Sequence, residues 1–311
     1  MLSRVASSIY WMARYMERAD NVARFIDVNT HLMLDLTLDR EATQWYPLVA
    51  TSGDDEDFNQ RYSVADEKNV LKFLTFDQRN PNSILQCIYR ARENARTVRE
   101  VIPVDVWEKI NELYHLTQEH SRKRSVADLM GYYRKVRLIG HMMTGLMENT
   151  MSRAQGWQFA RLGQMLERAD KTARLLDVKY FLLLPDAGYV DTPYDAVQWG
   201  AVLKSVNALE MYRQQFHTIN YKDVTQFLLF SKAFPRSVVF CLEDAAAALK
   251  SITMDVDRPD LASKEMATLC KSIHGSDASH IISAGLHEFI DIFQANLNLV
   301  DDAIYESFFK V

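Results

Sequence analysis

The sequence predicts an all-α fold, a multi-helix bundle with an internally duplicated helical motif. Glycine and proline are scarce, with 10 and 7 occurrences in 311 residues, which favours helices joined by short connections. Apolar residues recur with the 3.6-residue period of amphipathic helices, and no stretch sustains the alternation of a strand. One segment also occurs twice. We therefore expect at least ~65% helix and no sheet.

The duplicated segment is Glu17–Val28, which returns as Glu167–Val178 with eight identical positions of twelve. Roughly one match is expected by chance at typical residue frequencies, so the chain carries a repeated helical unit. On a helix, the charged and amide side chains of the first copy form one polar stripe opposite an apolar face. Arg18 and Arg168 lie at the edge of that apolar face, where each needs an anion because an unpaired buried charge is destabilising.

Two interpretations of the stripe stay open. It is either a structural ion network that holds two related helices together or a polar seam that binds a ligand or partner. The two helices are expected to pack near each other around a local pseudo-two-fold axis. Arg18 would then meet an acid of the second copy, Glu167 or Asp170, and Arg168 would meet an acid of the first.

A weaker third match covers Arg90–Arg96, which repeats two arginines and two alanines of the first copy at an offset of 72 positions. It adds Arg92, Glu93 and Asn94 to the candidate residues.

The remaining elements follow from helical patterning and from capping and breaking residues. Helices are expected over residues 3–38, 64–76, 84–101, 106–120, 125–150, 154–184, 194–217, 223–231, 235–252, 260–273 and 277–309. Ser83 and Asp105 are predicted N-caps, Pro235 is placed in a first helical turn, and the acidic segment 51–63 is predicted to be a loop.

The chain is expected to form a single all-helical domain, 1–311, or two subdomains of about 1–184 and 194–311. The boundary between those subdomains would fall in the proline-punctuated segment 185–193.

Composition narrows the class of protein. The net charge of −5 argues against a general nucleic-acid-binding surface. No signal-peptide layout and no apolar run of ~18 residues occurs, so we expect a cytoplasmic protein with no membrane or nucleic-acid partner. No metal or cofactor is expected, because the chain has no Cys/His cluster, no phosphate-binding loop and one Glu-x-x-His, Glu112–His115, where a two-metal bundle needs two.

These motifs together resemble the bacterial alpha-E family, an all-helical family named for its Glu-Arg motif. The resemblance covers nearly the whole chain and rests on Tyr10–Ala19, Ala91–Arg96, Gly156–Phe159, Leu162–Asp170, Phe227–Leu229 and Phe234–Ser237. The family usually has Arg after the glycine of the second motif, where this chain has Gln164. With the resemblance, the candidate polar seam comprises Glu17, Arg18, Asp20, Asn21, Arg24, Arg92, Glu93, Asn94, Glu167, Arg168, Asp170, Arg174 and Arg236.

The resemblance implies a gene neighbourhood of circularly permuted ATP-grasp ligases and transglutaminase-like peptidases, and a role in making or processing a peptide-like product. Because no catalytic motif occurs, the leading hypothesis is a non-catalytic accessory protein that binds and supports the ATP-grasp amide ligase, with the transglutaminase-like peptidase as a further partner. Two alternatives use the seam itself. One is an enzyme with Glu17 and Glu167 as acid/base groups, and the other is a peptide or carboxylate binder that clamps its ligand with Arg18 and Arg168.

Overall fold

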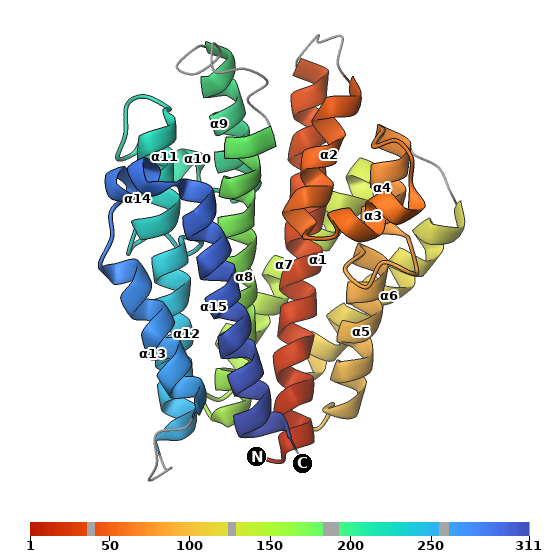
Figure 1. The fold of residues 1–311 in the computed structure, drawn as a ribbon. Coiled ribbons are helices and arrows are strands. Elements are labelled where there is room, and N and C mark those ends of the chain that lie inside the picture. Colours follow the sequence, from red (N-terminus) through yellow and green to blue (C-terminus); the bar gives the residue numbers. More distant parts are fainter. Residues whose placement is uncertain (36–40, 124–128, 183–192, 255–260, 311) are drawn as a thin grey trace. The chain divides into compact units, whose positions relative to one another are not determined.

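A computed structural model describes residues 1–35, 41–123, 129–182, 193–254 and 261–310 (Figure 1). Within these ranges 81% of the residues are α-helical and no strand forms. The predicted all-α class is therefore confirmed. None of the described helices combines the length and the apolar character needed to cross a membrane.

The chain forms two compact units. The terminal unit consists of Met1–Arg14 together with Arg153–Val311, and the central unit is Tyr15–Ser152. The first copy of the repeat thus belongs to the central unit and the second copy to the terminal unit. The units divide the chain at places other than the segment 185–193, most of which lies outside the described residues.

The long helix α1 (Ser3–Asp35) begins in the terminal unit and continues into the central unit. The central unit adds α2 (Glu41–Ser52), α3 (Asp55–Arg61), α4 (Glu67–Thr75), α5 (Ile84–Thr97), α6 (Val104–Lys123) and α7 (Leu129–Thr150). Along the chain, α4 packs on α5, α5 on α6 and α6 on α7, while α2 lies against α3 and α4.

The terminal unit is built around four helices that contact one another in a closed ring. The ring consists of α8 (Gln155–Leu182), α12 (Val238–Thr253), α13 (Leu261–His274) and α15 (Leu286–Ile304). In it α8 packs on α12, α12 on α13, α13 on α15, and α15 back on α8, which is the arrangement of a four-helix bundle. The smaller elements are α9 (Pro193–Ser205), α10 (Leu209–Arg213), α11 (Tyr221–Phe230), α14 (Ala278–Ala284) and a π-helical turn, η3 (Tyr305–Phe309).

Two of the predicted helices are each divided by a residue with positive φ. The predicted helix 194–217 ends as α9 and restarts as α10 beyond Asn207, whose φ is 54°. The predicted helix 277–309 is divided at Gly285, whose φ of 114° favours glycine. A helix cannot continue through either conformation.

The predicted helix starts are partly confirmed. Ser83 caps α5 by accepting a hydrogen bond from the backbone N–H of Gln86. Asp105 is not a cap, because α6 already begins at Val104. Pro235 is also outside its helix, since Ser237 caps α12 and accepts from the N–H of Phe240.

The predicted loop 51–63 contains α3, so that prediction was wrong. Its first turn carries Asp55, Glu56 and Asp57, which the N-terminal end of the helix dipole favours. Phe58 on this helix is 1% exposed and stacks on Tyr62, with 5.0 Å between the ring centroids. One buried aromatic residue therefore anchors a segment whose composition resembles that of a loop.

Candidate functional site

The polar stripe of the first copy belongs to the central unit and is buried. Glu17 is 5% exposed, Asp20 4%, Asn21 1% and Arg24 0%. The opposite face of α1 is buried as well, with Val22 at 3% and residues such as Phe25 and Ile26 at 4% or less. The stripe is therefore not a solvated face, and its charges must be satisfied by other protein groups.

Asp20 and Arg24, one helical turn apart, form an ion pair within this stripe. Arg24 uses Nη2 for the pair, while its Nε and Nη1 find no hydrogen-bond acceptor among the described residues. Asp20 lies against Gly140 of α7, where an added Cβ would stand 3.4 Å from the Cβ of Asp20. One turn beyond Arg24, Asp27 pairs with Arg137 of α7.

Arg18 lies at the edge of the stripe and is partly exposed. Its Nη1 donates to Oδ1 of Asn82 over 2.5 Å, and the Asn82 amide donates to Oδ1 of Asp54 over 2.6 Å. The guanidinium also lies over the ring of Tyr15, 5.8 Å from its centroid, and Arg90 approaches the same ring to 5.7 Å. Two cations therefore share one aromatic ring.

The second copy of the repeat lies in a buried network of the terminal unit. Glu167 is 0% exposed and accepts a hydrogen bond of 3.1 Å from Nε of Arg14. Arg14 also donates from Nη1 to Oδ2 of Asp301 over 2.5 Å and to the hydroxyl of Tyr10 over 3.1 Å. Tyr10 in turn donates to Oδ1 of Asp301 over 2.6 Å. Helices α1, α8 and α15 thus contribute to one network.

The pKa values of this network reflect burial and charge together. Burial lowers the pKa of Arg14, but the charges of Asp301, Tyr10 and Glu167 raise it more, so it stands well above its usual value. Burial raises the pKa of Tyr10 well above its usual range. Arg14 therefore stays charged and Tyr10 stays a neutral hydrogen-bond donor.

The other residues of the second copy are also paired. Asp170 contacts Lys171 at 3.2 Å and Nε of Arg174 at 2.9 Å. Burial raises the pKa of Asp170, but the charges of Lys171 and Arg174 lower it by more, so the pKa lies below its usual value.

The second copy also meets the start of α12. Arg168 donates to the backbone oxygen of Pro235 over 3.3 Å. The hydroxyl of Thr172 donates to the backbone oxygen of Arg236 over 2.9 Å, and Arg236 is 8% exposed. The structure thus brings the second-copy candidates and Arg236 into one region.

The third match contacts two helices of the central unit, since Arg90 reaches the ring of Tyr15 on α1 and Arg92 reaches α6. On α5, Arg92 donates to Asn111 of α6 over 2.8 Å and to Glu93 over 3.0 Å. Its guanidinium stacks on Tyr114, 4.5 Å from the ring centroid. The side chain of Asn94 has no polar partner among the described residues. Arg92 therefore ties α5 to α6.

The direct pairs predicted between the two copies, such as Arg18 with Glu167, join residues of different units and stay predictions. The sequence reasoning missed three members of the Glu167 network: Tyr10, Arg14 and Asp301. Arg14 had a signal, because it stands one turn before Arg18 amid apolar residues and at the position of Gln164 in the second copy. Asp301 had none, since 134 positions separate it from Glu167.

The comparisons with known proteins identify the family of the chain. It is 23% identical over 325 aligned residues to uncharacterised proteins of Mycobacterium bovis and of Mycobacterium tuberculosis strain CDC 1551. The alignments cover 97% of this chain but 36% of each relative, so the chain spans little more than a third of their length. No solved structure matches it significantly. Residues 1–309 match the family described as Alpha-E, a predicted alpha-helical domain with a conserved ER motif. The chain therefore belongs to the Alpha-E family.

Proposed function

We propose that this protein is a non-catalytic helical accessory module that binds a circularly permuted ATP-grasp amide ligase in a system that makes or modifies peptides. The observation that carries the proposal is that the acidic residues of the second repeat copy are buried and held in ion pairs. Glu167 is fully buried on Arg14, and Asp170 is held by Lys171 and Arg174. Carboxylates held in this way stabilise a scaffold and are poorly placed to exchange protons with a substrate.

A cavity on the central unit also favours a non-catalytic role for the repeat residues. An open cavity of about 470 Å³ lies on the central unit and is lined by Tyr114, His115, Gln118, Glu119 and Arg122 of α6. No residue of either repeat copy lines it. A mechanism that uses Glu17 and Glu167 as acid and base therefore has no support from this cavity.

Two further considerations support a partner role. The region similar to this chain occupies 36% of the mycobacterial relatives, so the module also occurs joined to other sequence in one polypeptide. The resemblance to the family implies ATP-grasp ligases and transglutaminase-like peptidases as neighbours. Because such ligases use ATP, we place the module in the cytoplasm.

A peptide or carboxylate binder is the second candidate function. The observation that favours it is the placement of Arg18 and Arg90 over the ring of Tyr15, since two guanidinium groups at one place suit an anionic group. In this second candidate function, the two guanidinium groups bind a carboxylate of the peptide product.

The direct test is co-purification of this chain with the neighbouring ATP-grasp ligase, followed by ligase assays with and without it. We expect a complex at micromolar concentration and a change in ligase activity. The Arg18→Ala, Arg90→Ala double variant should keep its helical spectrum and lose the complex, whereas Lys109→Ala, which removes an exposed pair with Glu112, should keep it. Absence of a complex together with unchanged ligase activity would count against the accessory role. Binding of free peptides without the ligase would favour the second candidate.

A further inference from the structure

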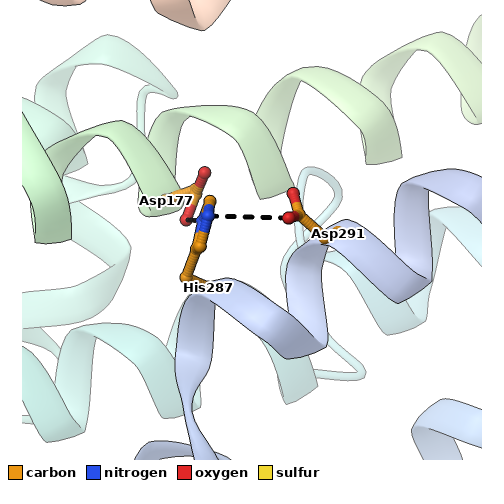
Figure 2. A group of neighbouring side chains, drawn as sticks. All are labelled: Asp177, His287 and Asp291. Carbon is orange, nitrogen blue, oxygen red and sulfur yellow. Dashed lines mark hydrogen bonds and ion pairs between the residues drawn. The ribbon is translucent and has the colours of Figure 1, made fainter.

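Three potential metal ligands from two helices meet in the terminal unit (Figure 2). Asp177, the last acid of the second repeat copy, lies on α8, while His287 and Asp291 lie on α15. Nδ1 of His287 is 2.8 Å from Oδ1 of Asp177, and Nε2 is 3.5 Å from Oδ2 of Asp291. One ligand atom from each residue lies within 4.8 Å of the other two.

Local geometry fixes the position of the imidazole. Gly285, with its φ of 114°, separates α14 from α15 and places His287 in the first turn of α15. Residues with a Cβ rarely adopt this φ, so a larger residue at this glycine would strain the turn. His287 and Asp291 are four residues apart and therefore face the same side of the helix. Because α15 packs on α8, Asp177 of α8 lies beside His287.

The two copies of the repeat differ at this position. In the first copy Asp27 meets the guanidinium of Arg137, a group that cannot release a proton to bind a metal. In the second copy the equivalent Asp177 meets an imidazole, which is the commonest metal ligand in proteins when it is neutral. A second carboxylate, Asp291, faces the other ring nitrogen. Asp27 also lies 3.7 Å from Nδ1 of the exposed His31, but no second carboxylate joins it in a three-ligand group among the described residues. The second copy thus brings a nitrogen donor and two carboxylates together, where the first copy has one carboxylate between an arginine and a histidine.

The distances match the requirements of a zinc site. Zinc binds imidazole nitrogen at about 2.0–2.1 Å and carboxylate oxygen at about 2.0–2.2 Å in a tetrahedron, which places two ligand atoms roughly 3.4 Å apart. Nε2 of His287 and Oδ2 of Asp291 stand 3.5 Å apart. A ligating histidine almost always donates its other ring N–H to a carboxylate or carbonyl oxygen, and Asp177 is in that position. The two carboxylates together balance the charge of a divalent cation.

We propose that His287 Nε2 and the Asp291 carboxylate bind a divalent transition metal, with zinc as the reference ion, while Asp177 orients the imidazole through Nδ1–H. Solvent completes the coordination, because Asp291 is exposed and the site opens outward. The mixed nitrogen and oxygen donors favour zinc over magnesium, which prefers oxygen ligands alone.

The test is calorimetric titration of Zn²⁺, and separately of Mg²⁺, into the chelator-treated full chain, with the Co²⁺ absorption spectrum as a report on coordination. We expect one Zn²⁺ per chain and far weaker Mg²⁺ binding. His287→Gln and Asp291→Asn should each weaken zinc binding by at least ~10-fold, and Asp177→Ala, which has no acceptor for Nδ1–H, by about 10–100-fold through loss of the orienting bond.

His274→Gln is the matched control. His274 lies 2.9 Å from Glu243, also in the terminal unit, but it belongs to no three-ligand group among the described residues. This variant should bind zinc as the parent does. If His287→Gln does not fold, Asp291→Asn still decides the question, because its side chain is 61% exposed. Zinc binding that is absent in the parent, or equal in the parent and in the Asp291 and Asp177 variants, would overturn the proposal.

Discussion

Arg14 donates from Nε to the carboxylate of Glu167 over 3.1 Å, so an arginine that precedes the first repeat copy serves the glutamate of the second copy. The pair is buried, with side-chain exposures of 6% and 0%. Nη1 of Arg14 donates two further hydrogen bonds, one to Asp301 and one to Tyr10. The glutamate of the second Glu-Arg sequence therefore pairs with a residue that lies outside the repeat.

Replacing Arg14 should be strongly destabilising. In Arg14→Met the carboxylates of Glu167 and Asp301 lose their shared cation inside the protein, and such a loss costs about 3–5 kcal/mol. Urea unfolding followed by circular dichroism measures the change. The matched control is Arg161→Met, which breaks a partly exposed pair with Asp244 and should cost about 0–1 kcal/mol. Equal losses in the two variants would show that Glu167 does not depend on Arg14.

Two glycines inside helices should respond to alanine in opposite directions. At Gly163 of α8 an added Cβ would stand 2.6 Å from the backbone oxygen of Tyr10 and 3.1 Å from Cγ of Arg14. Backbone cannot yield easily, so Gly163→Ala should destabilise by about 1–3 kcal/mol or more.

Gly145 of α7 is the comparison, because nothing lies within 4 Å of an added Cβ there. Gly145→Ala should stabilise by about 0.5–1 kcal/mol through helix propensity. Thermal melting of both variants tests the pair. A neutral Gly163→Ala variant would mean that α1 and α8 are not in close contact at this point.

The fold class could be predicted because periodicity and low glycine and proline content are local properties of the sequence. The error at α3 arose because one buried side chain, Phe58, decides the structure of an otherwise acidic segment, and its contact with Phe73 at 5.1 Å is tertiary. The repeat correctly identified charged residues that need partners. It could not identify the partners, since Arg14 pairs with Glu167 over 153 positions and Asp177 meets His287 over 110. Such pairs depend on how helices pack, and a single sequence does not record that.

The acid side of the stability profile should depend on Asp170. Its folded-state pKa is depressed by Lys171 and Arg174 despite the opposing effect of burial. A depressed carboxylate pKa contributes stability that is present above the unfolded value, ordinarily near 3.8, and that is lost as pH falls through the folded value. Asp170→Asn should therefore be less stable than the parent at neutral pH, and the difference should shrink at about pH 3. Urea unfolding at both pH values measures it, and a difference that grows in acid would contradict the assignment.

The last prediction separates structural from binding roles in the first copy. Asp20 and Arg24 form a buried pair in which Arg24 keeps two nitrogens without an acceptor among the described residues. A buried ion pair of this kind is weak support for stability, because desolvation offsets the attraction between the charges. Asp20→Asn alone should cost about 3–5 kcal/mol, since it leaves the fully buried guanidinium without its carboxylate. The double variant Asp20→Asn, Arg24→Met should recover most of that loss, because the apolar methionine removes the unsatisfied donors.

Urea unfolding of the single and double variants gives the interaction energy between the two positions, and co-purification with the ATP-grasp ligase on the same samples gives the functional effect. If the pair only holds the central unit together, the double variant should regain both stability and the complex. If the pair belongs to a binding seam, the double variant should regain stability and still fail to bind. A double variant that is no more stable than Asp20→Asn would show that the two side chains are not energetically coupled, and the arrangement of the first copy would need another explanation.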